Sequence, residues 1–162
     1  RLIVAPIFLI AITLWLDAKA MHGEILLLQL WGMWHWMMQA YGFARIYDAK
    51  AAPDARTPAL LDQALCFFWF GTAVFVLNPG LGAYATNFYL SGGPWIPAAA
   101  SRGFTQVWLA ASVVVTVYYT YVTVRTFLAG HRPNLLKLLF IVLTFSWLAY
   151  TSSIVERPLL SL

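Results

Sequence analysis

The chain has 162 residues, 62% of them hydrophobic and only 10% charged, and its mean hydropathy is +0.74. Soluble domains are about 45–50% apolar and about 25% charged, so this composition excludes an ordinary soluble globular protein. The net charge of +4 comes from basic residues scattered over short connections. Because these residues form no clustered basic patch in the sequence, we expect no nucleic acid among the partners.

The spacing of charged residues predicts an all-α fold, a polytopic transmembrane helical bundle with about five spans. A span needs about 20 mostly apolar residues, and the gaps between charges place the spans at residues 2–16, 24–47, 59–77, 104–128 and 135–155. Thr57-Pro58 begins a helix, while Gly130 and Pro133-Asn134 separate the last two spans into an antiparallel hairpin. We expect a single transmembrane domain over residues 1–162, trimmed from a longer chain because the first span starts almost at residue 1.

Basic residues predict the orientation, because loops rich in Lys and Arg stay in the cytoplasm. With the N-terminus in the cytoplasm, that side collects seven basic residues and the opposite side three. The seven are Arg1, Arg45, Lys50, Arg56, Arg125, Arg132 and Lys137, and the three are Lys19, Arg102 and Arg157. We therefore expect a cytoplasmic N-terminus, in a bacterial inner membrane.

The second span carries the most unusual side chains, in the stretch WGMWHWMMQAYGFARIYDAK at residues 31–50. At 100° per residue, Trp31, His35, Gln39 and Arg45 fall on one stripe of this helix. Polar side chains in a span are costly in lipid and face the bundle interior, a cavity or a bound group. We therefore expect His35 and Gln39 to point into the bundle.

His35 has three interpretations. It is a packed structural histidine, with Gln39 satisfied across a helix interface. Alternatively, it is an axial ligand of a tetrapyrrole of haem or chlorophyll type, in a site with Trp31, Met38, Gln39 and Tyr41. The third interpretation makes it one ligand of a non-haem metal centre, which needs ligands from outside this sequence because no HxxxH, HxxHH or ExxH motif is present. A carotenoid is a further candidate for a hydrophobic cofactor.

Residues 78–103 form an aromatic connection rich in Gly and Pro that we expect to be an extracytoplasmic loop. Aromatic rings settle in the headgroup zone of a membrane, which favours a lid at the interface. A re-entrant segment is the alternative, and it would need protein or water to satisfy its backbone.

Polar residues in the remaining spans predict contacts between helices. Asp62 is a candidate ion-pair partner of Arg45 or Arg125 at the inner membrane surface, whereas Cys66 is expected to be a packing residue. Hydroxyl residues recur at helical spacing along the fourth and fifth spans, so we expect these two stripes to face each other. The fourth span carries Ser112, Thr116, Tyr119, Thr123 and Thr126, and the fifth carries Ser146, Tyr150, Ser153 and Arg157.

The sequence contains no GxSxG, no Gly-rich phosphate loop and no paired carboxylates, which excludes the common hydrolase and nucleotide-binding classes. We expect an integral membrane subunit of a larger energy-converting complex, redox or photosynthetic, which is structural or holds a hydrophobic cofactor near His35. Membrane lipids and other membrane subunits are the expected partners. The alternative is a fragment of a membrane-embedded, metal-dependent oxidoreductase acting on a lipid-like substrate, and the sequence leaves open whether the chain is catalytic.

Overall fold

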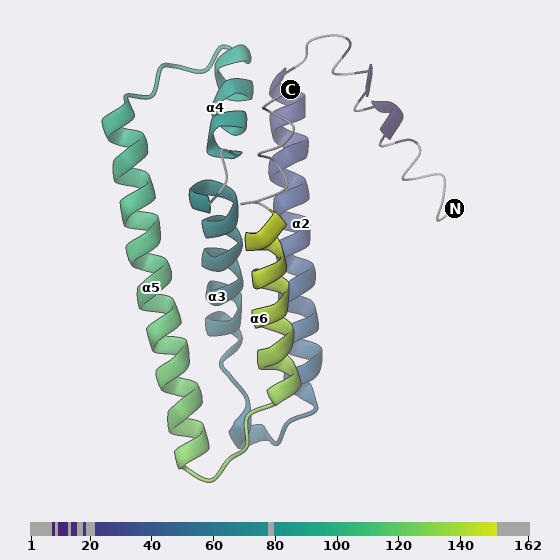
Figure 1. Ribbon diagram of the computed structural model, residues 1–162. Coiled ribbons are helices and arrows are strands. Elements are labelled where there is room, and N and C mark those ends of the chain that lie inside the picture. Colours follow the sequence, from purple (N-terminus) through teal and green to yellow (C-terminus); the bar gives the residue numbers. More distant parts are fainter. Residues whose placement is uncertain are drawn as a thin grey trace.

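A computed structural model describes residues 22–77 and 80–151, together with residues 8, 10–12, 14, 15 and 18 (Figure 1). No strand occurs among these residues, which confirms the prediction of an all-α fold. The expected first span, residues 2–16, lies largely outside the described part of the chain.

The helices follow one another closely along the chain. They are α2 (His22–Ala49), the 3-10 turn η1 (Pro53–Ala55), α3 (Ala59–Thr72) with its π-helical continuation η2 (Ala73–Leu77), α4 (Gly80–Leu90), α5 (Ala98–Leu128) and α6 (Leu135–Tyr150). Among the described residues, Pro53–Leu77 and Ala98–Leu128 are long and apolar enough to cross a membrane. The five-span arrangement is not confirmed, because α2 is long but too polar and α6 has only 16 residues.

Helix α3 lies at the centre of the bundle, with α2 and α6 on one side and α5 on the other (Figure 1). Ala40 and Ala44 are buried on α2, and their small side chains let the backbones of the neighbouring helices come close. Two core clusters result. One contains Ala44, Leu61, Leu65, Tyr119 and Ile141, and the other contains Met37, Ala40, Cys66 and Phe70.

The two hydroxyl stripes do not face each other, so this prediction is wrong. The stripe of α5 packs on α3, where Thr116 accepts a hydrogen bond from Trp69 Nε1 at 2.7 Å and the Ser112 hydroxyl lies 2.8 Å from that of Thr72. On α6, Ser146 and Tyr150 are exposed, and the expected Ser153 and Arg157 lie outside the described residues. Helix α6 packs on α2 and α3 instead.

The segment expected as a loop at residues 78–103 is largely helical. It contains helix α4 and the start of α5. Helix α4 packs on α2, where Asn87 donates a hydrogen bond to Gln29 at 3.0 Å. Gly92 follows α4 with φ of 84°, a conformation that favours glycine, and Pro97 precedes α5 as its N-cap. Helix α5 therefore begins at Ala98 rather than near Phe104.

The signals at the other helix ends agree with the structure, with one shift. Gly130 has φ of 86° after α5, and the Asn134 side chain caps α6 by accepting hydrogen bonds from the backbone N–H groups of Leu136 and Lys137. At the start of α3, however, Pro58 rather than Thr57 is the N-cap residue.

Candidate functional site

The outer face of α2, defined by Trp31, His35 and Gln39, is the first candidate site. The Gln39 side-chain amide nitrogen lies 2.9 Å from His35 Nε2. The Trp31 and His35 rings are stacked, with centroids 6.4 Å apart and an interplanar angle of 22°. Because the helix places residues four apart one above the other, these three side chains form a continuous strip.

All three side chains of this outer face are exposed, so the expectation that His35 and Gln39 point into the bundle is wrong for the described part of the molecule. The buried side of α2 carries Ala44, which lies nine residues after His35 and therefore about half a turn away around the helix. The prediction that Trp31, His35 and Gln39 lie side by side on α2 is confirmed. The prediction that this face of α2 points into the bundle is wrong, because residue spacing does not determine which face of a helix the other helices cover.

The five residues expected around a cofactor are divided between two sides of α2. Trp31, His35 and Gln39 share the outer face, whereas Met38 and Tyr41 are half-buried and pack against the core cluster around Phe70. A flat hydrophobic group beside His35 would therefore contact the strip of exposed aromatic residues on α2. Further exposed aromatic residues of α2 flank that strip on its two sides, namely Trp34, Trp36 and Phe43, which are 45%, 61% and 51% exposed.

The second candidate site is an ionic cluster formed by Arg45, Asp48, Asp62 and Lys137. Arg45 Nη1 lies 2.8 Å from Oδ2 of Asp48 and 2.8 Å from Oδ2 of Asp62. Lys137 Nζ lies 2.9 Å from Oδ1 of Asp48 and 2.7 Å from Oδ1 of Asp62. The two carboxylates are thus bridged by both cations, and α2, α3 and α6 are joined at one end of the bundle.

The cluster is almost completely shielded from solvent. Asp48, Asp62 and Lys137 are each exposed by 1% or less, and only Arg45 reaches the surface, with 31% of its side chain exposed. The Tyr119 hydroxyl donates to Asp62 Oδ1 at 3.2 Å, and Arg45 also donates to the Thr57 carbonyl at 2.9 Å. Within the described residues, no buried side-chain nitrogen or oxygen lacks a hydrogen-bond partner.

Of the two ion pairs that the sequence predicted for Asp62, with Arg45 or with Arg125, the structure contains the one with Arg45. Arg45 and Asp62 are paired, whereas Arg125 is exposed on α5 and is in no salt bridge with the charged residues that the structure describes. Asp48 and Lys137 were missed. The available signal was RIYD at residues 45–48, where Arg45 and Asp48 are three residues apart and share a helix face.

The arrangement of charges in this cluster makes it a structural connection. Two carboxylates balance two cations, and each carboxylate is already bonded to both of them. Elsewhere in the described residues, no group of three or more His, Cys, Asp or Glu side chains is placed to hold a metal ion. No protein-family model, curated protein or solved structure matches the chain.

Proposed function

We propose that this chain is an integral membrane subunit of a larger energy-converting complex, and that the outer face of α2 holds a hydrophobic cofactor of the tetrapyrrole class at His35. The observation that carries the proposal is the exposed His35–Gln39 pair beside the Trp31 ring. A redox-active or light-absorbing macrocycle is commonly held by an axial imidazole ligand and by flat apolar walls, and this strip offers both.

The membrane part of the proposal is supported by the exterior of the bundle. Two segments, Pro53–Leu77 and Ala98–Leu128, meet the length and composition needed for a span. Helix α5 buries only Ser112 and Tyr119 and exposes large apolar side chains along its outer side, among them Val107, Val113, Val117 and Phe127. Such a surface suits lipid, whereas a soluble monomer rarely exposes so large an apolar patch. A bacterial inner membrane is the expected location.

The position of His35 supports the cofactor part. In a bilayer, an imidazole and an amide exposed on the outside of a bundle are costly unless something polar or coordinating meets them. The Gln39 amide satisfies one nitrogen of the His35 ring, Nε2, and leaves Nδ1 without a partner among the described side chains. His35 would bind the metal of a macrocycle through Nε2 only after the Gln39 amide turns away from that atom. Gln39 and the cofactor therefore compete for Nε2.

The test is the visible absorption spectrum of the complex purified from its native membrane. We expect a tetrapyrrole band in the wild type, its loss in His35→Leu, and its retention in Gln39→Ala, since this change frees Nε2. His131→Leu is the matched control, because His131 is exposed in the connection between α5 and α6. A wild-type complex without a tetrapyrrole band, or a His35→Leu spectrum identical to that of His131→Leu, would reject the proposal.

A further inference from the structure

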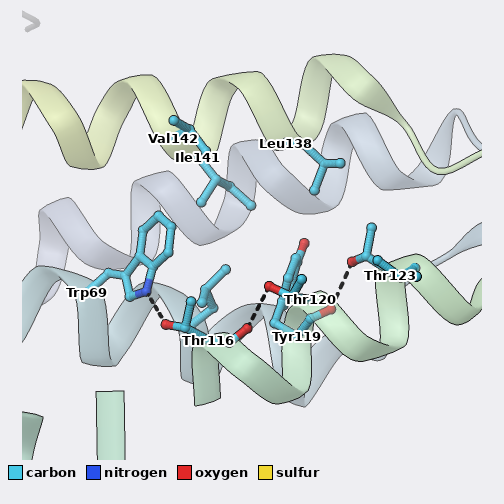
Figure 2. Close-up of a pocket in the computed structure, with 10 residues that line it drawn as sticks. Trp69, Thr116, Tyr119, Thr120, Thr123, Leu138, Ile141 and Val142 are labelled. Carbon is cyan, nitrogen blue, oxygen red and sulfur yellow. Dashed lines mark hydrogen bonds between the residues drawn. The ribbon is translucent and has the colours of Figure 1, made fainter. Parts of the chain in front are cut away.

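A groove runs along the bundle between α5 and α6, with α3 as its floor. It has a volume of about 270 Å³ and opens toward the outside. Figure 2 shows its walls: Thr116, Thr120 and Thr123 lie on α5, Ile141 and Val142 lie on α6, and Trp69 of α3 lies at one end, beside Thr116. The groove exists because α5 and α6 each pack on α3 and make few contacts with each other.

The groove offers almost no hydrogen-bond donor to an occupant. The hydroxyls of Thr116, Thr120 and Thr123 donate to backbone carbonyls one turn earlier in α5, at 2.7, 2.9 and 2.9 Å. Figure 2 shows the bonds of Thr120 and Thr123. The Trp69 N–H is used by Thr116. What remains facing the groove is mainly methyl groups and aliphatic side chains, so its chemistry fits a hydrocarbon chain.

The surroundings of the groove favour the same occupant. Val124 and Val142 lie at the entrance of the groove and are 48% and 49% exposed. Outside the entrance, both helices expose further apolar residues, such as Val117 on α5 and Leu143 on α6. A hydrocarbon chain in a surrounding bilayer therefore enters the groove from the side without crossing a polar rim.

The end of the groove nearest the α5–α6 connection is polar and basic. There Thr123 and Leu138 also line a small adjoining space with Asn134 and Lys137. The charges of the ionic cluster cancel, so the exposed residues decide the sign at this end of the bundle. Among the described residues at this end, these are Lys50, Arg56, Arg125 and Arg132 against a single exposed carboxylate, Asp54. Arg132 lies in the connection that crosses this end of the groove.

We propose that the α5–α6 groove binds an anionic phospholipid, with one acyl chain in the groove and the headgroup at the basic end near Arg132. Basic sites between membrane helices attract anionic headgroups by charge. Only the membrane location is shared with the proposed function, since His35 lies on another face of the bundle. Loss of the tetrapyrrole band in the preceding experiment would neither support nor oppose lipid binding here.

The test compares binding of phosphatidylglycerol and phosphatidylcholine, with identical acyl chains, to the purified and delipidated chain by native mass spectrometry. We expect phosphatidylglycerol to bind about tenfold more tightly. Val142→Trp fills the groove and should weaken phosphatidylglycerol binding at least tenfold, whereas Leu143→Trp, at a neighbouring exposed site outside the groove, should change it less than twofold. Thr120→Trp with Val117→Trp as its control repeats the comparison on α5.

Removing single basic charges tests whether the lipid headgroup binds near Arg132. Arg132→Gln should weaken binding of phosphatidylglycerol about fivefold and leave that of phosphatidylcholine unchanged, because one basic residue near an anionic headgroup contributes about that factor. Lys50→Gln removes the same charge at the same end of the bundle, away from the groove. Equal binding of the two lipids, equal effects of Val142→Trp and Leu143→Trp, or equal effects of Arg132→Gln and Lys50→Gln would overturn the proposal. So would loss of a co-purifying subunit in Val142→Trp with lipid binding unchanged, which would assign the groove to a protein partner.

Discussion

Among the described residues that are less than 2% exposed, Lys137 has the largest side chain. Its ammonium group contacts both carboxylates of the ionic cluster and is almost fully buried. Removing a charge from water is expensive, and attraction to a close partner offsets this cost only while both partners remain. Each member of the cluster therefore depends on the others.

Lys137→Met should destabilise the protein by about 3–5 kcal/mol, because Asp48 and Asp62 would stay buried with only Arg45 to compensate two negative charges. The measurement is the free energy of unfolding in detergent. Lys50→Met is the control, since Lys50 is exposed at the same end of the bundle and its loss should cost less than about 1 kcal/mol.

A second substitution distinguishes two causes of the lower stability of Lys137→Met, namely the unbalanced buried charge and the lost packing of the lysine side chain. In the Lys137→Met background, the two carboxylates and Arg45 carry one excess negative charge. Asp48→Asn removes that charge and should recover part of the lost stability. If Lys137→Met behaves like Lys50→Met, the buried cluster contributes nothing to stability, and the electrostatic account of this end of the bundle fails.

The cluster also shows what could be read from the sequence at the scale of residues. The pairing of Arg45 with Asp62 was among the predicted possibilities, because both lie near helix ends that meet at one side of the bundle. Lys137 is 89 residues from Asp48 and 75 from Asp62, and was counted only as a loop cation. No local signal links residues so far apart, since their meeting depends on how α6 packs on α2 and α3.

At the scale of elements, the contact between α3 and α5 depends on one glycine. A Cβ at Gly71 would overlap the Trp108 side chain. That indole is surrounded by aromatic rings of Phe67, Phe68 and Phe75, whose centroids lie 5.2–5.3 Å from it. The ring has little room to move, so α3 and α5 approach closely only because residue 71 has no side chain.

Gly71→Ala should therefore destabilise the bundle by about 1–3 kcal/mol, the usual cost of overpacking a core. Gly103→Ala on α5 is the matched control: nothing lies within 4 Å of the added methyl group, and the change should be neutral or stabilising by up to about 1 kcal/mol because alanine favours helix. Thermal unfolding of both variants in the same detergent compares them. Equal melting temperatures of the two variants would contradict the prediction and show that the Trp108 side chain moves to accommodate the added methyl group.

Helix ends were predictable where a local signal sets them. Gly130 and Asn134 determine where α5 ends and α6 begins through their own backbone and side-chain geometry, and both signals are present in the sequence. Helix α4 was not predicted, because its segment is rich in Gly and its helix packs on α2 with the help of the Asn87–Gln29 contact. Likewise, the direction of the His35 stripe depends on the covering helices and not on the spacing within α2.

At the scale of the whole molecule, the arrangement of the ends makes the membrane proposal testable. The connections at residues 50–58 and 129–134 lie at one end of the bundle, and the connection between α4 and α5 lies at the other (Figure 1). The exposed basic residues Lys50, Arg56, Arg125 and Arg132 gather at the first end. Basic residues favour the cytoplasmic side, so this end should face the cytoplasm.

Single cysteines in a Cys66→Ala background test this orientation with a maleimide that does not cross membranes. Asp54→Cys and Arg132→Cys mark the basic end and Ser91→Cys marks the other, and all three positions are exposed. In intact cells we expect labelling of Ser91→Cys alone, and after permeabilisation labelling of all three. The unmodified protein is the control, since its Cys66 is buried and should stay unlabelled. Labelling of the basic end alone in intact cells would invert the orientation, and labelling of both ends would mean that the bundle does not span the membrane.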